Sequence, residues 1–261
     1  MAALAAGCQQ STSPAPPSGS PAPASAPASA PAAATPEGSR TPGPIALPQG
    51  SDTVTLDPAD FSSTIDNPFW PMASGSRWVY REVDDEGQIV QVEVTVTGDT
   101  REILGIEAVV VHDRVTQDGA LVEDTLDWYA QDGDGNIWYM GEDTKEYEDG
   151  KVVSTAGSWE AGVDGAQPGI IVPAHPEPGM TYRQEYDAGE AEDAARVLSI
   201  DERVDVPFGS FDRVLMTKDY TPLEPTLLEH KFYAREVGPV LVLGIAGSVG
   251  REELVEFVAG R

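Results

Sequence analysis

The sequence predicts an all-β fold, in which an antiparallel curved sheet is built from two tandem related halves and follows a disordered Pro/Ala/Ser-rich linker. Apolar and polar residues alternate over Val90–Thr97, which is the period-2 pattern of a strand with one buried face. Strand-forming aromatic segments flank Asp132–Asn136, whose Asp, Gly and Asn residues suit a tight turn, so this stretch predicts a hairpin. Sequence motifs also recur about 100 residues apart, which indicates an internal duplication.

The duplication rests on motifs that keep a nearly constant spacing. The Gly-x-x-aromatic motif of Gly75–Trp78 returns at Gly179–Tyr182. The aromatic strand Trp128–Ala130 returns at Phe232–Ala234, again before a turn that contains glycine. The alternation of apolar and polar residues, and a glycine that precedes an apolar run, also repeat at a similar spacing along the chain. We therefore expect two related halves, at about residues 68–160 and 170–258.

The folded part is expected to begin near Val54 with one or two helical turns. Asp57 suits the N-cap and Pro58 the first helical position. The segment Asn67–Pro71 ends any helix, because residues before proline avoid the helical region. Within it, Trp70 is expected to plug one end of the core.

Strands are expected to follow in regular order, separated by turns. In the first half they are Trp78–Val83, Val90–Thr97, Ile106–Val115, Leu121–Gln131, Ile137–Glu146 and Lys151–Trp159. In the second half they are Glu190–Arg196, Val204–Pro207, Asp212–Tyr220, Leu228–Arg235, Val240–Leu243 and Glu253–Val258. Glu190–Arg196 has the composition of a helix, and only its place in the repeat predicts a strand. The joint at 162–179 is expected to be a loop, with Ile170–Val172 as a short strand or a buried plug.

The first residues predict export and lipidation. Residues 1–8 read as the end of a bacterial lipoprotein signal, with small residues before Cys8 and polar residues after it. Cys8 is the predicted lipid attachment site. A complete signal also needs a positive segment and a longer apolar core, so we expect it to start upstream. Residues 9–53 form the predicted disordered tether, and residues 54–258 form the β-rich domain.

Composition excludes several classes of function. The formal net charge is −28, which argues against nucleic acid and against direct binding to anionic head groups. Its simplest interpretation is a solvated acidic surface. The chain has one cysteine, so it forms no internal disulfide and no zinc site of several cysteines. No stretch after Cys8 is apolar for the length of a membrane span.

Three segments also carry a resemblance to known proteins. They are Asn67–Pro71 with Gly75 and Trp78, Asp127–Asp132, and Gly157–Gly162. Together they resemble a family of uncharacterised bacterial (actinobacterial-type) secreted lipoproteins, over about Asp57 to Val258. The resemblance implies export and a β-rich fold. It brings no catalytic residue and no substrate.

Candidate chemistry is sparse. Asp132, Asp134 and Asn136 have the spacing of a calcium loop, but the sixth position is Ile137 instead of glycine, and we prefer a turn. None of the histidines has a second ligand at a neighbouring position, and nucleophile, phosphate-loop and dinucleotide motifs are absent. We therefore predict no catalytic residue, no cofactor and no metal. A carboxylate pair of the kind that glycosidases use remains open, since acidic residues are numerous.

The aromatic residues offer the main lead on function. Core filling is the simpler interpretation of Trp128, Trp138 and Phe232. The alternative is an apolar cleft that binds a lipid, a glycan or a hydrophobic peptide. We accordingly expect a monomeric lipoprotein on the outer face of the cell membrane, with a non-catalytic domain that binds a ligand or another protein. The alternatives are an envelope hydrolase with paired carboxylates and a purely structural module.

Overall fold

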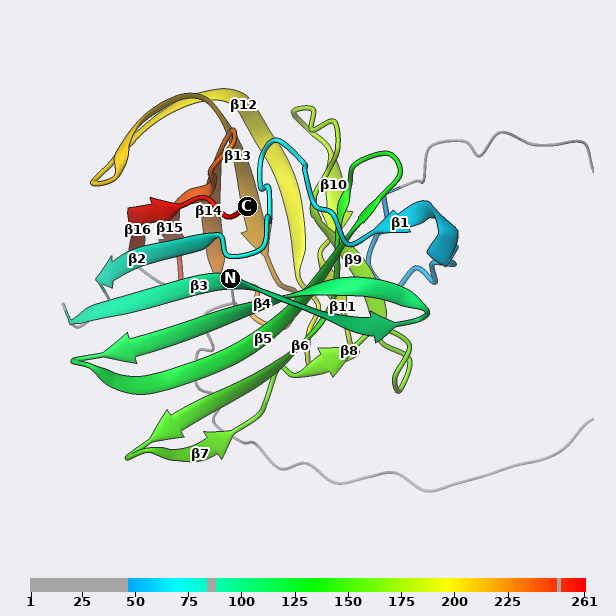
Figure 1. Cartoon of the computed structure of the whole chain (residues 1–261), viewed down its shortest axis with the longest axis horizontal. Coiled ribbons are helices and arrows are strands. Elements are labelled where there is room, and N and C mark those ends of the chain that lie inside the picture. The colour runs from blue at the N-terminus through cyan, green and yellow to red at the C-terminus, as the bar shows by residue number, and fades with distance from the viewer. Residues whose placement is uncertain (1–46, 84–87, 248–249) are drawn as a thin grey trace, which may run out of the picture. The chain divides into compact units, whose positions relative to one another are not determined.

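The computed structural model describes residues 47–83, 88–247 and 250–261. Within these ranges it contains an antiparallel sheet of 16 strands and a 3₁₀ turn at Pro58–Asp60 capped by the Asp57 side chain (Figure 1). The predicted all-β class and the curved antiparallel sheet are confirmed. The predicted signal, Cys8 and residues 9–46 of the tether lie outside the described residues.

The strands follow the chain with short connections. The first group is β1 (Phe61–Ser62), β2 (Arg77–Val83), β3 (Ile89–Ile103), β4 (Ile106–Gln117), β5 (Ala120–Asp132), β6 (Ile137–Glu148), β7 (Lys151–Ser154), β8 (Trp159–Glu160) and β9 (Gln167–Val172). The second group is β10 (Thr181–Arg183), β11 (Glu185–Tyr186), β12 (Ala194–Val206), β13 (Gly209–Tyr220), β14 (Leu228–Ala234), β15 (Gly238–Ala246) and β16 (Arg251–Val258). The order across the sheet is β10-β12-β13-β14-β15-β16-β2-β3-β4-β5-β6-β9-β11.

The two halves repeat one arrangement of five antiparallel strands. These are β2–β3–β4–β5–β6 in the first half and β10–β12–β13–β14–β15 in the second. The amides of Gly75 and Gly179 each donate a backbone hydrogen bond of 2.9 Å, the first to Val96 of β3 and the second to Val197 of β12, which hold equivalent places in the two halves. A register shift falls after Trp128 in one half and after Phe232 in the other. These equivalences agree with the duplication that the sequence predicts.

The two ends of the sheet meet at one point of the chain, which we call the seam. The order across the sheet starts at β10 and finishes at β11, and Gln184 alone separates these strands along the chain. Gly169 of β9 packs directly on the backbone of Arg183 and Gln184, where a Cβ would overlap the peptide group. Far from the seam, β16 pairs with β2 and joins the halves into a nearly closed sheet (Figure 1).

Some strand limits differ from the prediction. Residues Ala194–Arg196 belong to β12, while residues 188–190 form a turn closed by a bridge between Asp187 and Ala191. Residues 151–159, expected as one strand, divide into β7 and β8 around a turn, because both short strands pair with β6 at different places. Ile170–Val172 is part of β9, which is one of the two alternatives for that segment.

An aromatic layer fills one part of the inner face. Trp70, expected to plug the core, is 2% exposed and packs on Tyr129 with ring centroids 5.4 Å apart. Tyr129 stacks in turn on Tyr139 across the β5–β6 pair at 4.9 Å. Tyr80 donates from its hydroxyl to a backbone carbonyl of β15 at 3.1 Å. Such buried rings dominate the energetics of a core, and here they connect both halves of the sheet.

The segment before the first strand contacts the second half. Arg183 is 1% exposed, and its guanidinium donates to the carbonyl oxygens of Gly50, Asp52 and Pro168, each at 2.7 Å. Three hydrogen bonds from one charged group to backbone are strong contacts. Residues 47–53, predicted to be part of the tether, are therefore held on the domain.

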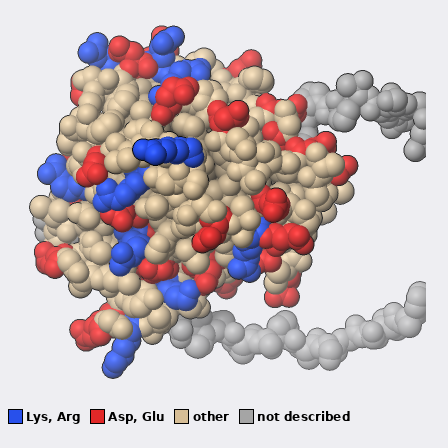
Figure 2. Space-filling model, in the orientation of Figure 1, with Lys and Arg blue, Asp and Glu red and all other residues tan. Residues whose placement is uncertain are grey.

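Charge is distributed over the surface and the interior. Figure 2 shows basic and acidic side chains interspersed on one face of the molecule. Among the described residues, seven acidic side chains are buried, against the two buried basic residues Arg183 and Lys231. The acidic excess thus continues inside the sheet, where a solvated surface does not explain it. No helix in the described part of the chain has the length and apolar character to cross a bilayer.

Candidate ligand-binding site

The aromatic residues of the predicted cleft lie in close contact with protein. Trp138 is fully buried, and its indole N–H donates to Asp132 Oδ2 at 2.8 Å. Trp128 is 4% exposed, with the guanidinium carbon of Arg101 4.1 Å from its ring centroid. Phe232 is buried as well. These three side chains have the contacts of core residues.

The β5–β6 register explains where the two tryptophans point. Trp138 stands opposite Ala130, and Trp128 stands opposite Gly141, so the two rings are not direct cross-strand partners. Successive residues of a strand face opposite sides of the sheet. The tryptophans are therefore on the other side of β5 from Tyr129, which faces the inner aromatic layer.

Asp132 organises the turn of that hairpin. Its Oδ1 accepts from the backbone amides of Asp134, Gly135 and Asn136 at 2.9–3.0 Å. Its Oδ2 accepts from the Asn136 side chain and from Trp138, both at 2.8 Å. Five donors thus occupy the two oxygens of Asp132, which is the structure of a carboxylate-capped turn.

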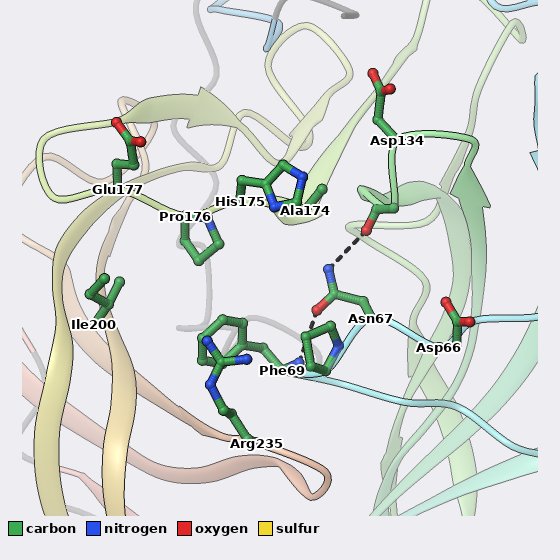
Figure 3. Close-up of a pocket in the computed structure, with 12 residues that line it drawn as sticks. Asp66, Asn67, Phe69, Asp134, Ala174, His175, Pro176, Glu177, Ile200 and Arg235 are labelled. Carbon is green, nitrogen blue, oxygen red and sulfur yellow. Dashed lines mark hydrogen bonds between the residues drawn. The ribbon is translucent and has the colours of Figure 1, made fainter.

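A pocket of about 480 Å³ lies between the two equivalent hairpin turns, β5–β6 and β14–β15 (Figure 3). Its lining residues are Asp66, Asn67, Pro68, Phe69, Asp134, Gly135, Ala174, His175, Pro176, Glu177, Ile200 and Arg235. Figure 3 shows Arg235 against Phe69 on one side and His175 with Pro176 on the other. The Arg235 guanidinium carbon lies 4.2 Å from the Phe69 ring centroid. Acidic and basic groups both line this pocket, so it selects no ligand class by charge.

A second feature is a set of acidic side chains on the inner face, which we call the inner carboxylate cluster. Its members are Asp127 of β5, Glu142 of β6, Glu185 of β11, Asp193 just before β12, Asp219 of β13 and Glu229 of β14. The register places Asp127 opposite Glu142 and Asp219 opposite Glu229, and cross-strand partners share a face. The strands thus bring acidic residues from both halves together.

Part of the cluster is held by hydrogen bonds to neutral side chains. The Tyr139 hydroxyl donates to Asp127 Oδ1 at 2.6 Å, and the Trp159 indole donates to Glu185 Oε2 at 2.9 Å. Asp219 accepts from Thr217 at 2.5 Å and from Gln184 at 3.1 Å. Tyr139 and Trp159 belong to packed aromatic pairs and Gln184 belongs to the seam, so closure of the sheet also positions the cluster.

Lys231 is the cation of this region. Its Nζ lies 3.2 Å from Asp219 Oδ2, and both side chains are less than 10% exposed. Burial alone lowers the pKa of Lys231, but Asp219, Glu229 and Asp193 together raise it above its ordinary value. Lys231 is therefore charged, and among the described residues it is the cation that forms an ion pair with a member of this cluster of six carboxyl groups.

The pKa values of the carboxyl groups show the effect of this imbalance. Burial, together with repulsion from Glu185 and Asp127, raises the pKa of Glu142 well above its ordinary value. Burial and repulsion from Asp193 raise the pKa of Glu185 in the same way, despite the hydrogen bond from Trp159. Burial also raises the pKa values of Asp193 and Glu229, against the attraction of Lys231. Protons therefore neutralise part of the cluster when no other cation is near.

Several polar atoms in this region are buried without a hydrogen-bond partner among the described residues. They are Asp127 Oδ2, Glu229 Oε1 and the hydroxyl of Tyr182. Asp127 is fully buried, Tyr182 is 1% exposed and Glu229 is 8% exposed. Buried polar groups in folded proteins are nearly always paired, so each of these atoms needs an explanation. By contrast, Glu142 and Asp193 keep part of their surface accessible to solvent.

A second carboxylate group extends the cluster along the same face. In the strand register, Glu252 of β16 stands opposite Glu82 of β2, and Asp113 of β4 stands opposite Thr125 of β5. Burial and repulsion from Asp113 raise the pKa of Glu252 to about 8, and the same two causes raise the pKa of Glu123 to about 7. Within the described ranges, no three His, Cys, Asp or Glu side chains have the arrangement of a metal site.

Sequence reasoning missed the inner carboxylate cluster. A signal was present in β5, where Glu123, Thr125, Asp127 and Tyr129 alternate and therefore share one face. The apolar residues Leu126 and Trp128 alternate with them and indicated the opposite face as the buried one. The structure buries both faces of the strand at this point.

The fold and the cluster together define a class: an all-β domain, nearly closed and acidic on its inner face. No family model matches the chain, and no curated protein matches it in sequence. Two solved structures are similar in fold. One is a protein of Bacteroides fragilis NCTC 9343 named as exported and YmcC-like in fold, with 15% identity, a TM-score of 0.42, and coverage of 73% of this chain and 99% of that one. The other, from Parabacteroides distasonis ATCC 8503, is named as a lipoprotein, with 13% identity, a TM-score of 0.42, and coverage of 74% and 99%.

Proposed function

We propose that this protein is an extracytoplasmic lipoprotein whose β-domain binds a ligand without catalysis on the inner face of its sheet. The observation that carries the proposal is the inner carboxylate cluster with its unpartnered atoms, above all Asp127 Oδ2 and Glu229 Oε1. An unpaired buried acceptor costs about 1–3 kcal/mol, and more when it is charged. A bound solute that donates to these oxygens removes that cost.

The proposed location rests on the sequence. Cys8 follows three small residues and precedes polar ones, as at a lipidation site. We propose that the Pro-rich segment after it acts as a tether, because Pro-rich linkers are semi-stiff spacers of about 3.1 Å per residue where they are extended. A monomeric domain on this tether would stand clear of the outer face of the cell membrane, and its ligand would come from the cell envelope or the medium.

Paired carboxylates also raise the alternative of an envelope hydrolase. Such an enzyme needs one protonated and one ionised carboxyl, held apart in pKa by their surroundings. Here burial raises the pKa values of both Glu142 and Glu185, with repulsion from Glu185 adding to the rise for Glu142 and repulsion from Asp193 adding to the rise for Glu185. The pair therefore does not divide into an acid and a base, which favours binding over hydrolysis.

The binding function is tested by native mass spectrometry of the full chain purified from its own host. We expect a co-purifying small molecule that leaves when the protein is unfolded, and that is lost from an Asp127→Asn, Glu229→Gln variant. The matched control is Glu148→Gln at the exposed end of β6, which should keep the molecule. A spectrum of the bare chain alone, at every purification stage, would contradict ligand binding.

The anchor and the hydrolase alternative have separate tests. Expression behind an added lipoprotein signal peptide should place the protein in the membrane fraction, and Cys8→Ser should release it. An unchanged distribution of Cys8→Ser would refute the lipid anchor. Release of reducing sugar from cell-wall glycans, abolished by Glu142→Gln, would replace the binding proposal by the hydrolase.

A further inference from the structure

We propose that the inner carboxylate cluster binds an organic polyamine, whose ammonium groups pair with Asp127, Glu142, Glu185 and Glu229. This inference rests on the proposed binding function and names the ligand class of the same site. It follows from the charge balance, the unpartnered acceptors and the spread of the carboxyl groups over the sheet.

The charge balance calls for a cation. Lys231 forms its ion pair with Asp219. Among the described residues, no Lys or Arg forms an ion pair with Asp127, Glu142, Glu185, Asp193 or Glu229. Arg183, two residues before Glu185 in the chain, donates to three backbone carbonyls instead. Removing carboxylates from water is costly unless each finds a positive partner or a proton.

The unpartnered atoms point to a donor. Asp127 uses Oδ1 for the Tyr139 hydroxyl and leaves Oδ2 without a partner, although the side chain is fully buried. Glu229 leaves Oε1 without a partner in the second half of the molecule. An ammonium group carries three N–H donors and no acceptor. It can therefore donate to several carboxylate oxygens that face one another. It would also replace the protons that Glu142 and Glu185 otherwise hold.

The spread of the carboxyl groups favours an organic amine over a metal ion. The six residues come from five strands and one loop, and no three of them converge as metal ligands do. A polyamine carries several positive charges along a flexible methylene chain. Its methylenes and ammonium groups suit the neighbouring aromatic layer, where Tyr139 and Trp159 pack edge to face with centroids 5.4 Å apart.

The second carboxylate group leads us to expect a ligand with more than two charges. Glu252 also has an oxygen without a partner among the described residues, Oε1, and its pKa is raised by burial, by Asp113 and by Glu82. Repulsion between Glu252 and Glu229 contributes to that rise, so the two groups of carboxyls are electrostatically continuous. An amine with three or more charges can reach both groups, and we expect it to bind more tightly than a diamine.

The experiment titrates the full chain with spermidine by isothermal calorimetry and follows thermal unfolding in parallel. We expect saturable binding and a rise in Tm. Putrescine should bind at least about tenfold more weakly, which corresponds to the loss of one ammonium–carboxylate contact of about 1.4 kcal/mol. The uncharged 1,8-octanediol should not bind. Equal heats for spermidine and octanediol, or no heat for spermidine, would overturn the proposal.

Variants separate the cluster from the acidic surface. Asp127→Asn and Glu229→Gln should each weaken spermidine binding at least about tenfold, since each removes one charged contact. Both replace a buried carboxyl group that has one oxygen without a partner by an amide of the same shape, so their unfolding temperatures should stay close to that of the unaltered protein, which separates lost binding from lost folding. Glu148→Gln, exposed on β6, should bind as the unaltered protein does. An equal loss in Glu148→Gln would show surface screening only and would sink the idea.

The outcomes also distinguish this inference from the binding function it rests on. Tight stoichiometric binding of Ca²⁺, abolished by Asp127→Asn, would replace the polyamine by a metal ion. A neutral molecule that co-purifies with the chain, together with no heat from spermidine, would refute the polyamine and leave the binding function standing. Absence of both would refute both.

Discussion

Substitution of Gly169 by alanine tests the seam that closes the sheet. An added Cβ at this position would overlap the carbonyl carbon and oxygen of Gln184 and would lie 2.6 Å from the carbonyl oxygen of Arg183. All three are backbone atoms between β10 and β11, so no side chain can rotate away. Overpacking of this kind costs about 1–3 kcal/mol, and we take about 2 kcal/mol. For a domain of this size the corresponding fall in Tm is about 4–8 °C.

The matched control is Gly209→Ala at the start of β13. Its nearest neighbour is a ring atom of Phe211 at 3.7 Å, which is ordinary contact, and its backbone is not in the left-handed region. Because alanine restricts the unfolded chain, this variant should be equal to the unaltered protein or about 0.4–1 kcal/mol more stable. Thermal unfolding followed by near-ultraviolet circular dichroism measures both variants. If Gly169→Ala and Gly209→Ala melt within about 1 °C of each other, the close approach at the seam is wrong.

Three further predictions follow from contacts described above. Asp132→Ala leaves five N–H groups without their acceptor and should lower the free energy of unfolding, measured in urea, by about 3 kcal/mol. Asp132→Asn should lower it by less. Equal unfolding curves for the variants and the unaltered protein would refute the role of the carboxylate. Arg183→Lys removes the guanidinium group whose hydrogen bonds hold residues 47–53, so cleavage before Asp52 by endoproteinase Asp-N should become about tenfold faster. The control Arg196→Lys, on the exposed face of β12, should leave the cleavage rate unchanged. Because the pKa values of Glu123 and Glu252 are raised to about 7 and about 8, the folded state keeps protons that the unfolded state has lost, and stability should fall as pH rises from 5 to 8. The slope is at most about 1.4 kcal/mol per pH unit for each group, reduced by their partial exposure, and Glu252→Gln should flatten it; a stability that rises over this range would contradict the raised values.

Much of the sheet could be predicted because its signals are local. Alternation in Val90–Thr97 and the turn residues of Asp132–Asn136 determine strands and a hairpin without reference to the rest of the chain. The repeat placed the second set of strands, including Ala194–Arg196, whose composition alone favours a helix. The predicted strand limits were less accurate where strand pairing determines them. Residues 151–159, for example, are divided into two strands because they pair with β6 at two separate places.

The candidate site could not be predicted because it depends on closure. Glu185 follows the seam, and Asp127 lies more than fifty residues earlier in the chain, so only the completed sheet brings them near each other. The sequence also does not distinguish a buried carboxylate from a solvated one. In β5 the alternation of Leu126 and Trp128 indicated a single buried face, whereas β5 is buried on both faces at Asp127 and Trp128.

The pairing of β16 with β2 has a consequence for how the molecule folds. Val258 stands opposite Arg77, so this ladder joins residues that are very distant along the chain, while each half is built from neighbouring hairpins. Contacts of such long range form slowly, because the entropy of closing the loop is lost before the pairing is gained. Until that moment β2 and β16 are open edges of two separate meanders, and open edges recruit other chains. A substitution that weakens this ladder should therefore appear first as aggregation during refolding, before any change in the finished domain.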